Sequence, residues 1–158
     1  MSVPPDLYQV KSHFDKCIHE FGATPRGVDW NSDASQQIRF DQLLQLIRED
    51  SASILDYGCS YGALADYLAS KGLHLDYYGF DIVQSAIEMA RKLHADDPRR
   101  TFFSDKTKLP VCDYVVASGI FNYRGEVPDA EWTDYILSTL HEFDKLSTKG
   151  FASNFLTN

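Results

Sequence analysis

The 158-residue sequence has few cysteines, and none is spaced as a metal ligand would be. Cys17, Cys59 and Cys112 stand far apart, and no Cys-x-x-Cys or Cys/His pair has the spacing of a zinc site. An odd number of scattered cysteines is typical of free thiols in a reducing compartment. The sequence therefore predicts no metal site and no disulfide framework.

Long apolar runs are also missing. No stretch approaches the roughly 20 consecutive apolar residues that a membrane helix needs. The first residues, MSVPPDLYQV, have neither the basic flank nor the apolar centre of a signal peptide. These absences predict a cytoplasmic protein with no membrane partner.

Positive charge is scarce, since 15 Lys and Arg stand against 23 Asp and Glu and give a net charge of -8. Such a surface repels a polyphosphate unless a basic patch is set apart. The densest basic group is interleaved with acids and consists of Arg99, Arg100, Lys106 and Lys108 among Asp96, Asp97 and Asp105. We therefore expect a small-molecule substrate and no nucleic-acid partner.

Internal repeats and low-complexity segments are absent as well. The hydrophobic fraction of 44% and the charged fraction of 24% are those of an ordinary soluble globular protein. Together with the length, they predict one domain over residues 1–158, with an N-terminal helical cap over 1–50 and an α/β core over 51–158.

What is present, from residue 53 onward, is an alternation of short apolar runs with amphipathic stretches. This order predicts parallel strands joined by right-handed crossovers, and continuous apolar strand cores indicate helices on both faces. Two further helices precede the alternation, over 7–21 and over 34–49, the second capped by Ser32 or Asp33. The fold class is thus α/β with a doubly wound, mostly parallel sheet. The expected strands are Ser53–Tyr57, Leu75–Phe80, Thr101–Phe103, Asp113–Ala117 and Phe151–Leu156, and the later helices are 62–71, 83–95 and 129–145.

The stretch SILDYGCSYGALADYL, residues 53–68, marks the first candidate site. Asp56 ends the first strand of the alternating region, and Gly58 and Gly62 turn the chain into a helix. In an open parallel sheet, ligands bind beyond the carboxyl ends of the strands. Glycine lets the backbone pass close to a ligand, and helix N-termini direct N–H donors into the same space. Asp56 would add a carboxylate suited to an amino group.

Two more acids follow the next two strands. Asp81 stands at the end of HLDYYGFDI, 19 residues after Gly62, where a carboxylate accepts hydrogen bonds from both hydroxyls of a ribose. Asp105 follows the strand in FFSDKTKLP, where it could accept from an adenine amino group. We expect these two carboxylates and Asp56 to converge on one crevice.

The fingerprints of phosphate-rich ligands are missing. A dinucleotide site needs G-x-G-x-x-G, but Ser60 and Ala63 occupy the second and third glycine positions counted from Gly58. No phosphate-binding loop with Lys-Ser/Thr occurs either. The predicted ligand therefore has ribose and adenine but no phosphate close to the backbone.

These segments resemble the class I S-adenosylmethionine-dependent methyltransferases. LDYGCSYGALADYL resembles motif I, and YYGFDIVQSAIEMARK resembles the second-strand motif with its ribose acid. FFSD resembles the adenine-contacting position, and CDYVVASGIFN resembles the fourth strand. The resemblance covers about 53–158. It implies a Rossmann-like methyltransferase fold, S-adenosyl-L-methionine as cofactor, and methyl transfer to a small molecule by in-line displacement.

The resemblance also implies roles for individual residues. Asp56, Gly58 and Gly62, with Cys59 between them, would line the methionine part of the cofactor. Asp81 would hold the ribose with Ile82 beside the adenine, Ser104 and Asp105 would meet the adenine edge, and Ser118 would face the sulfonium. Ser60 replaces the middle glycine of motif I, and we expect it to keep a negative φ.

The segment GVDWNSDASQQIRF resembles one that precedes motif I in small, largely uncharacterised bacterial members. In such enzymes, N-terminal helices often cover the cofactor. Arg39 could then reach the methionine carboxylate, and Trp30 could roof the pocket.

No catalytic residue is assigned from the sequence. Candidates for a base are Asn122 and Tyr123 after the fourth strand, and Tyr8, His13 and His19 near the N-terminus. Two other functions stay open: a cofactor-binding or partner-dependent module without catalysis, and a nicotinamide oxidoreductase on a similar sheet.

The family sheet usually has seven strands, and this chain ends at the fifth, in GFASNFLTN. The last two strands are therefore missing, and the fifth would be an exposed edge that invites another chain. A piece of a longer enzyme is the favoured explanation. Self-association through this edge and a shortened family member are the alternatives.

Overall fold

A five-stranded parallel sheet forms the centre of the protein, in the strand order β3-β2-β1-β4-β5. The computed structural model describes residues 5–28 and 32–156. The strand order reverses between β1 and β4, which is the place where doubly wound sheets bind ligands. The predicted fold class is confirmed. The strands are β1 (Ser53–Tyr57), β2 (Asp76–Phe80), β3 (Arg100–Phe103), β4 (Cys112–Ala117) and β5 (Ser147–Ser153).

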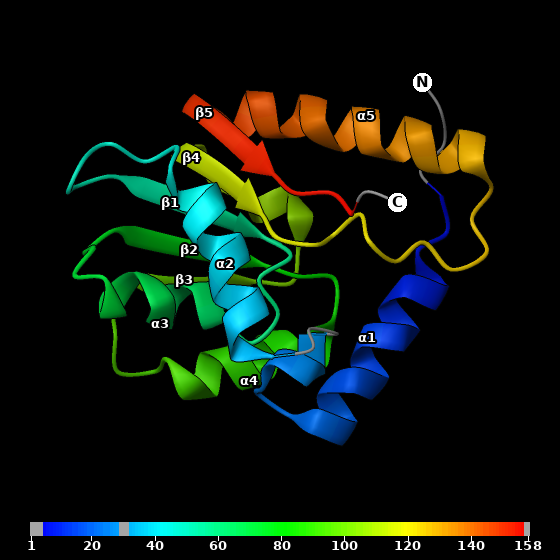
Figure 1. Ribbon diagram of the computed structural model, residues 1–158, viewed down its shortest axis with the longest axis horizontal. Coiled ribbons are helices and arrows are strands. Elements are labelled where there is room, and N and C mark those ends of the chain that lie inside the picture. Colours follow the sequence, from blue (N-terminus) through cyan, green and yellow to red (C-terminus); the bar gives the residue numbers. More distant parts are fainter. Residues whose placement is uncertain (1–4, 29–31, 157–158) are drawn as a thin grey trace.

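Five α-helices surround the sheet. α5 runs beside β5 and β4, and α1 lies at the lower right of Figure 1, below the start of α5. The side chain of Ser32 caps the second helix by accepting a hydrogen bond from the Ser35 N–H. The helices are α1 (Tyr8–Phe21), α2 (Asp33–Leu44), α3 (Ala63–Ser70), α4 (Gln84–Leu93) and α5 (Asp129–Leu146). Of two 3-10 turns, η1 (Pro25–Val28) lies between α1 and α2, and η2 (Lys106–Lys108) lies between β3 and β4.

Three predicted boundaries are wrong by three residues or more, and one of them is the end of β5, which lies at Ser153 and not at Leu156. α2 ends at Leu44 rather than at residue 49, because the chain tightens there into bonds from Leu46 N to Leu43 O and from Ile47 N to Leu44 O. β5 begins at Ser147, four residues before the predicted start. The reason is that α5 passes directly into the strand, where Ser147 pairs with Cys112 of β4.

Helices cover both faces of the sheet, as the continuous apolar strands predict. Ile54 of β1 packs with one buried cluster, which contains Leu64 of α3 and Ile87 of α4. The next residue, Leu55, packs with the opposite cluster, which contains Phe143 of α5. The period of two along a strand thus sends successive apolar side chains into two separate cores.

α1 lies across the carboxyl ends of the strands. Near its N-terminus, Gln9 accepts a hydrogen bond from the backbone N–H of Glu126 at 2.8 Å and donates one to the Glu126 carboxylate at 3.2 Å. Further along, Ile18 packs with Val83 and Ala86 beside the start of α4. α1 therefore spans from the loop after β4 to α4 and forms a roof over this edge of the sheet (Figure 1).

β5 is one edge of the sheet, as expected. Lys149 bonds to Glu49 at 3.0 Å, and the register between β4 and β5 shifts near Cys112 and Tyr114. A lysine and an irregular register both limit pairing with a further strand. Self-association through this edge stays a prediction. No helix among the described residues is long and apolar enough to cross a membrane.

Candidate functional site

A cavity of about 360 Å³ opens at the carboxyl ends of β1, β2 and β4, roofed by α1 and α2 and flanked by α5. This is the switch point of the sheet, where the sequence predicts a ligand. Seven of the ten predicted site residues line it: Arg39, Asp56, Gly58, Cys59, Asp81, Ile82 and Ser118.

The loop 58–62 after β1 is held by backbone hydrogen bonds. The N–H groups of Gly58 and Cys59 both donate to the carbonyl of Phe80 at the end of β2, at 2.7 and 2.8 Å. The Ser60 N–H donates to Asp81 Oδ2 at 2.8 Å, and the Gly62 N–H donates to the Cys59 carbonyl at 2.9 Å. The ends of β1 and β2 are thereby locked together at the cavity wall.

Three residues of this loop have positive φ. Gly58 and Gly62 have φ of +88° and +87°, which glycine adopts without penalty. Ser60 has φ of +48°, so the expected negative φ is wrong. The bond from its N–H to Asp81 holds the serine in this conformation, which is strained for a residue with a Cβ.

Gly62 does not line the cavity. A Cβ at this position would lie 2.7 Å from His94 Nε2 and 3.0 Å from the Phe102 ring. The missing side chain of Gly62 therefore makes room for the rings of His94 and Phe102 behind the loop, and not for a ligand. The expectation that Gly62 lines the cofactor pocket is corrected accordingly.

Asp56 is a buried carboxylate at the cavity wall, with 3% of its surface exposed. Burial raises its pKa to about 7, although the Tyr77 hydroxyl donates a hydrogen bond to Oδ2 at 2.6 Å and opposes this shift. The nearby negative charge of Asp81 makes a smaller contribution to this rise. A carboxyl group with this pKa ionises readily when a cationic group enters the cavity.

Asp81 uses both carboxylate oxygens within the protein. Oδ2 accepts from the Ser60 N–H, and Oδ1 accepts from the Val83 N–H at 2.9 Å. Burial raises the pKa of this carboxyl as well, and the backbone donors counteract the rise. A carboxylate has about four acceptor positions, so about two remain for hydroxyl groups of a ligand.

Ser104 and Asp105 are exposed and do not line the cavity. Asp105 Oδ1 accepts from the Thr107 N–H at 3.0 Å and from the Thr107 hydroxyl at 2.6 Å, and these bonds hold its pKa below the usual value. The chain turns away after β3 because this acid caps η2. The expected convergence of three carboxylates is therefore wrong for the third, and two converge.

Two buried polar atoms at the end of β4 face the cavity without a partner. Ser118 Oγ and Asn122 Oδ1 make no hydrogen bond within the described part of the chain. The Gly119 N–H between them donates to Asn154 Oδ1 at 2.7 Å, which ties this loop to the residues after β5. Buried polar atoms are rarely left unsatisfied, so this pair is placed to bond a ligand.

Sequence reasoning missed the apolar wall of the cavity. No short motif marks these side chains, which become neighbours only when α1 and α5 pack around the end of β4. They are Leu7, Val10 and Phe14 from the α1 segment, Trp132 and Tyr135 from α5, and Leu156 after β5.

The candidate bases from the N-terminal region lie elsewhere. His13 stacks on Tyr123, with ring centroids 4.0 Å apart, in a groove next to the cavity. Tyr8 and His19 are largely exposed. Trp30 lies outside the described residues. Within the described ranges, no group of three or more His, Cys, Asp or Glu residues could hold a metal ion, and Cys17, Cys59 and Cys112 form no disulfide.

Comparison with known proteins gives the family. Residues 31–142 match the family model of a methyltransferase domain. A Mycobacterium tuberculosis H37Rv protein whose name describes it as a methyltransferase, Rv1506c, is 38% identical over 109 residues. This alignment covers 69% of the chain and 66% of the relative. The chain belongs to this methyltransferase family.

Solved structures confirm the Rossmann-like methyltransferase fold. Mycolic acid cyclopropane synthase CmaA1, crystallised with S-adenosylhomocysteine (SAH) and CTAB, has a TM-score of 0.68 at 16% identity, covering 96% of this chain and 57% of that one. A TehB-like S-adenosylmethionine-dependent methyltransferase from Corynebacterium glutamicum has a TM-score of 0.56 at 20% identity, covering 91% and 73%. At such identities the likeness concerns the fold alone. The chain spans less than two thirds of Rv1506c and of CmaA1.

Gly62→Ala tests the packing behind the loop, with Gly72→Ala as its matched control. Both glycines have positive φ, but a Cβ at Gly72 would have no atom within 4 Å. We expect Gly62→Ala to lower the free energy of unfolding by about 2 kcal/mol more than Gly72→Ala, because only the first overpacks its site. Urea denaturation measures the difference, and equal losses would contradict the packing role.

The raised pKa of Asp56 predicts a pH-dependent stability. The folded state binds the Asp56 proton more tightly than the unfolded state, so this contribution is fully present below pH 4 and is lost as pH rises through 7. Between pH 5 and 7, the wild type should lose about 2 kcal/mol more than Asp56→Asn, which does not titrate. Denaturation curves at several pH values measure this, and parallel curves would show that Asp56 ionises normally.

Proposed function

We propose that the protein is an S-adenosylmethionine-dependent methyltransferase acting on a small molecule with an apolar body. The observation that carries this proposal is the cavity itself. It places Asp56 and Asp81 at the switch point of the sheet, beside the two unpartnered polar atoms of Ser118 and Asn122. The membership of the methyltransferase family supports the same reading.

The residues present fit the cofactor. Asp81 would accept hydrogen bonds from the two ribose hydroxyls with its remaining acceptor positions, and Ile82 would flank the adenine. Asp56, once ionised, would face the amino group. Arg39 of α2 would meet the carboxylate. Gly58 lines the cavity as well, and its missing side chain leaves room for Ile120, because a Cβ there would lie 2.2 Å from Ile120 Cγ2.

S-adenosylmethionine supplies, when bound, a methyl group that its sulfonium makes electrophilic. The task of the chain is then to position the acceptor and to exclude water. Asn122 Oδ1 would accept an N–H or O–H of the acceptor, and Ser118 Oγ would lie toward the reacting region. The nucleophilic atom of the acceptor must lie about 3 Å from the methyl carbon, opposite the sulfur.

We assign no general base. No histidine stands among the described residues that line the cavity. An acceptor amine in its neutral form needs no base before transfer, because its lone pair is already available and its proton can leave to water afterwards. An acceptor nitrogen would thus fit the site without a base, whereas an alcohol, whose proton has a high pKa, would need one.

The apolar wall indicates the body of the acceptor. Phe14, Trp132 and Tyr135 bring aromatic rings to the cavity wall. Such a surface binds an aromatic or aliphatic group better than a sugar, whose hydroxyls would lose water without gaining partners. A cofactor-binding module without catalysis and a nicotinamide oxidoreductase have no comparable support. Location in the cytoplasm stays a prediction.

Asp81→Asn tests the cofactor site, with Asp105→Asn as the matched control. The amide cannot accept from both backbone donors and both ribose hydroxyls, so we expect S-adenosylhomocysteine to bind at least about tenfold more weakly. Asp105 lies outside the cavity, and the affinity of its variant for S-adenosylhomocysteine should stay within about twofold of that of the wild type. Titration calorimetry measures both. Equal affinities in all three proteins would remove the ribose role, and no binding to the wild type would remove the proposed function.

Leu156→Asp tests the apolar acceptor region, with Leu137→Asp as its control. The two leucines are 59% and 60% exposed, so neither change should unfold the protein. Only Leu156 lines the cavity. The probe is N-phenyl-1-naphthylamine, an uncharged aromatic amine whose fluorescence rises in apolar surroundings. We expect Leu156→Asp to weaken its binding about fivefold or more, because a charge at the wall resists desolvation. Equal binding by both variants would place the probe elsewhere.

A further inference from the structure

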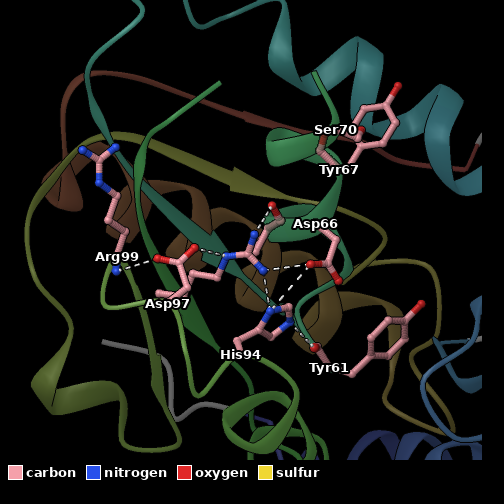
Figure 2. A network of polar contacts seen from close by, with 9 residues as sticks. Tyr61, Asp66, Tyr67, Ser70, His94, Asp97 and Arg99 are labelled. Atoms are coloured by element: carbon pink, nitrogen blue, oxygen red, sulfur yellow. Dashed lines mark hydrogen bonds and ion pairs between the residues drawn. The ribbon is translucent and has the colours of Figure 1, made fainter. Parts of the chain in front are cut away.

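His94 is a buried histidine that the proposed chemistry does not use. It caps the end of α4, with 6% of its surface exposed. It lies behind the loop 58–62, called the cofactor loop below, and does not line the cavity. Its ring stacks on Phe102, with centroids 5.3 Å apart. Its Nε2 points at the carbonyl oxygen of Tyr61, 3.2 Å away (Figure 2).

The neighbours of His94 fix its tautomer. Arg100 NH1 lies 2.5 Å from His94 Nδ1, and a guanidinium can only donate hydrogen bonds. Asp66 Oδ1 also faces Nδ1, but at 3.7 Å it lies beyond hydrogen-bond distance. Nδ1 is therefore the acceptor for Arg100, and the ring proton sits on Nε2, which donates it to the Tyr61 carbonyl. Arg100 is itself held by Asp66 at 2.8 Å and by Asp97 at 3.0 Å.

The carbonyl that His94 holds belongs to the peptide between Tyr61 and Gly62. The N–H of the same peptide donates to the Cys59 carbonyl at 2.9 Å, so this peptide plane is fixed from both sides. Cys59, Ser60 and Tyr61 all line the cavity, and Ser60 carries the strained φ. The missing side chain of Gly62 leaves the space that the imidazole needs.

We propose that His94 is a positioning residue for the cofactor loop: its neutral Nε2–H tautomer, set by Arg100, holds the Tyr61 carbonyl and keeps residues 59–61 in their binding conformation. This assignment rests on the proposed function, because it takes the loop to be the cofactor's. His94 itself touches no ligand. Without the N–H donor, the loop could relax the strained backbone at Ser60. A ligand would then have to order the loop again on binding, which would weaken its affinity.

The test compares His94→Gln with His94→Phe at pH 8. Glutamine keeps an N–H donor in reach of the Tyr61 carbonyl, whereas phenylalanine keeps only the stacking on Phe102. His74→Gln is the control, since His74 is exposed and precedes β2 at the far end of the sheet. We expect S-adenosylhomocysteine to bind His94→Phe about five- to tenfold more weakly than the wild type. The affinities of His94→Gln and His74→Gln for S-adenosylhomocysteine should stay within about twofold of that of the wild type.

Two further measurements need no ligand. Nitrogen-15 spectra of the histidine rings should show His94 as the Nε2–H tautomer, and amide hydrogen exchange at residues 59–63 should be faster in His94→Phe than in His94→Gln. Binding by His94→Phe equal to the wild type would reduce His94 to a packing role and overturn the proposal. Equally weak binding by both His94 variants, or an Nδ1–H tautomer, would overturn it too. If the wild type binds no S-adenosylhomocysteine, the proposed function fails, and the exchange rates and the tautomer still decide whether His94 positions the loop.

Discussion

The carboxylate of Asp81 is the interaction on which the site depends. It joins the Ser60 N–H after β1 to the Val83 N–H at the start of α4, so one side chain fixes the loop, the strand end and the helix relative to each other. These two bonds stabilise the charged form of a group that burial disfavours. They also fix the rotamer of the carboxylate, so its remaining lone pairs have a defined direction.

Around this anchor, the cavity has two chemically different sides. The β1–β2 side brings buried acids and tightly held backbone, which suits a polar, cationic and sugar-bearing ligand. The side formed by α1, α5 and the end of β4 brings rings and aliphatic groups, broken by Ser118 and Asn122.

Much of this arrangement was predictable from the sequence. Apolar runs bounded by turns place β1 to β4 within one or two residues, because a strand buried on both faces needs such a run. Asp56 is the penultimate residue of β1 and Asp81 directly follows β2, so the parallel topology brings both to the same edge of the sheet. Asp105 shows the limit of that reasoning. It is the second residue after β3, and there Thr107 gives its carboxylate two local hydrogen bonds as the chain turns away.

Other parts of the site were beyond sequence reasoning. The role of Gly62 depends on His94, which comes from another helix, and only the packed structure brings the two together. The positive φ of Ser60 depends likewise on a bond to a residue 21 positions later. The predicted start of β5 was wrong because residues 147–150, STKG, contain no apolar run. They pair with β4 because α5 continues into the strand without a loop.

That direct junction between Leu146 and Ser147 restricts how such a protein can vary in length. A single inserted residue in α5 would turn everything before it by about 100° around the helix axis. The same insertion within β5 would exchange its two faces. Insertions and deletions should therefore accumulate in the loop between β4 and α5, residues 118–128, which carries Asn122 and Tyr123. Evolution could in this way reshape acceptor recognition through loop length while leaving the sheet and the carboxylate anchor untouched.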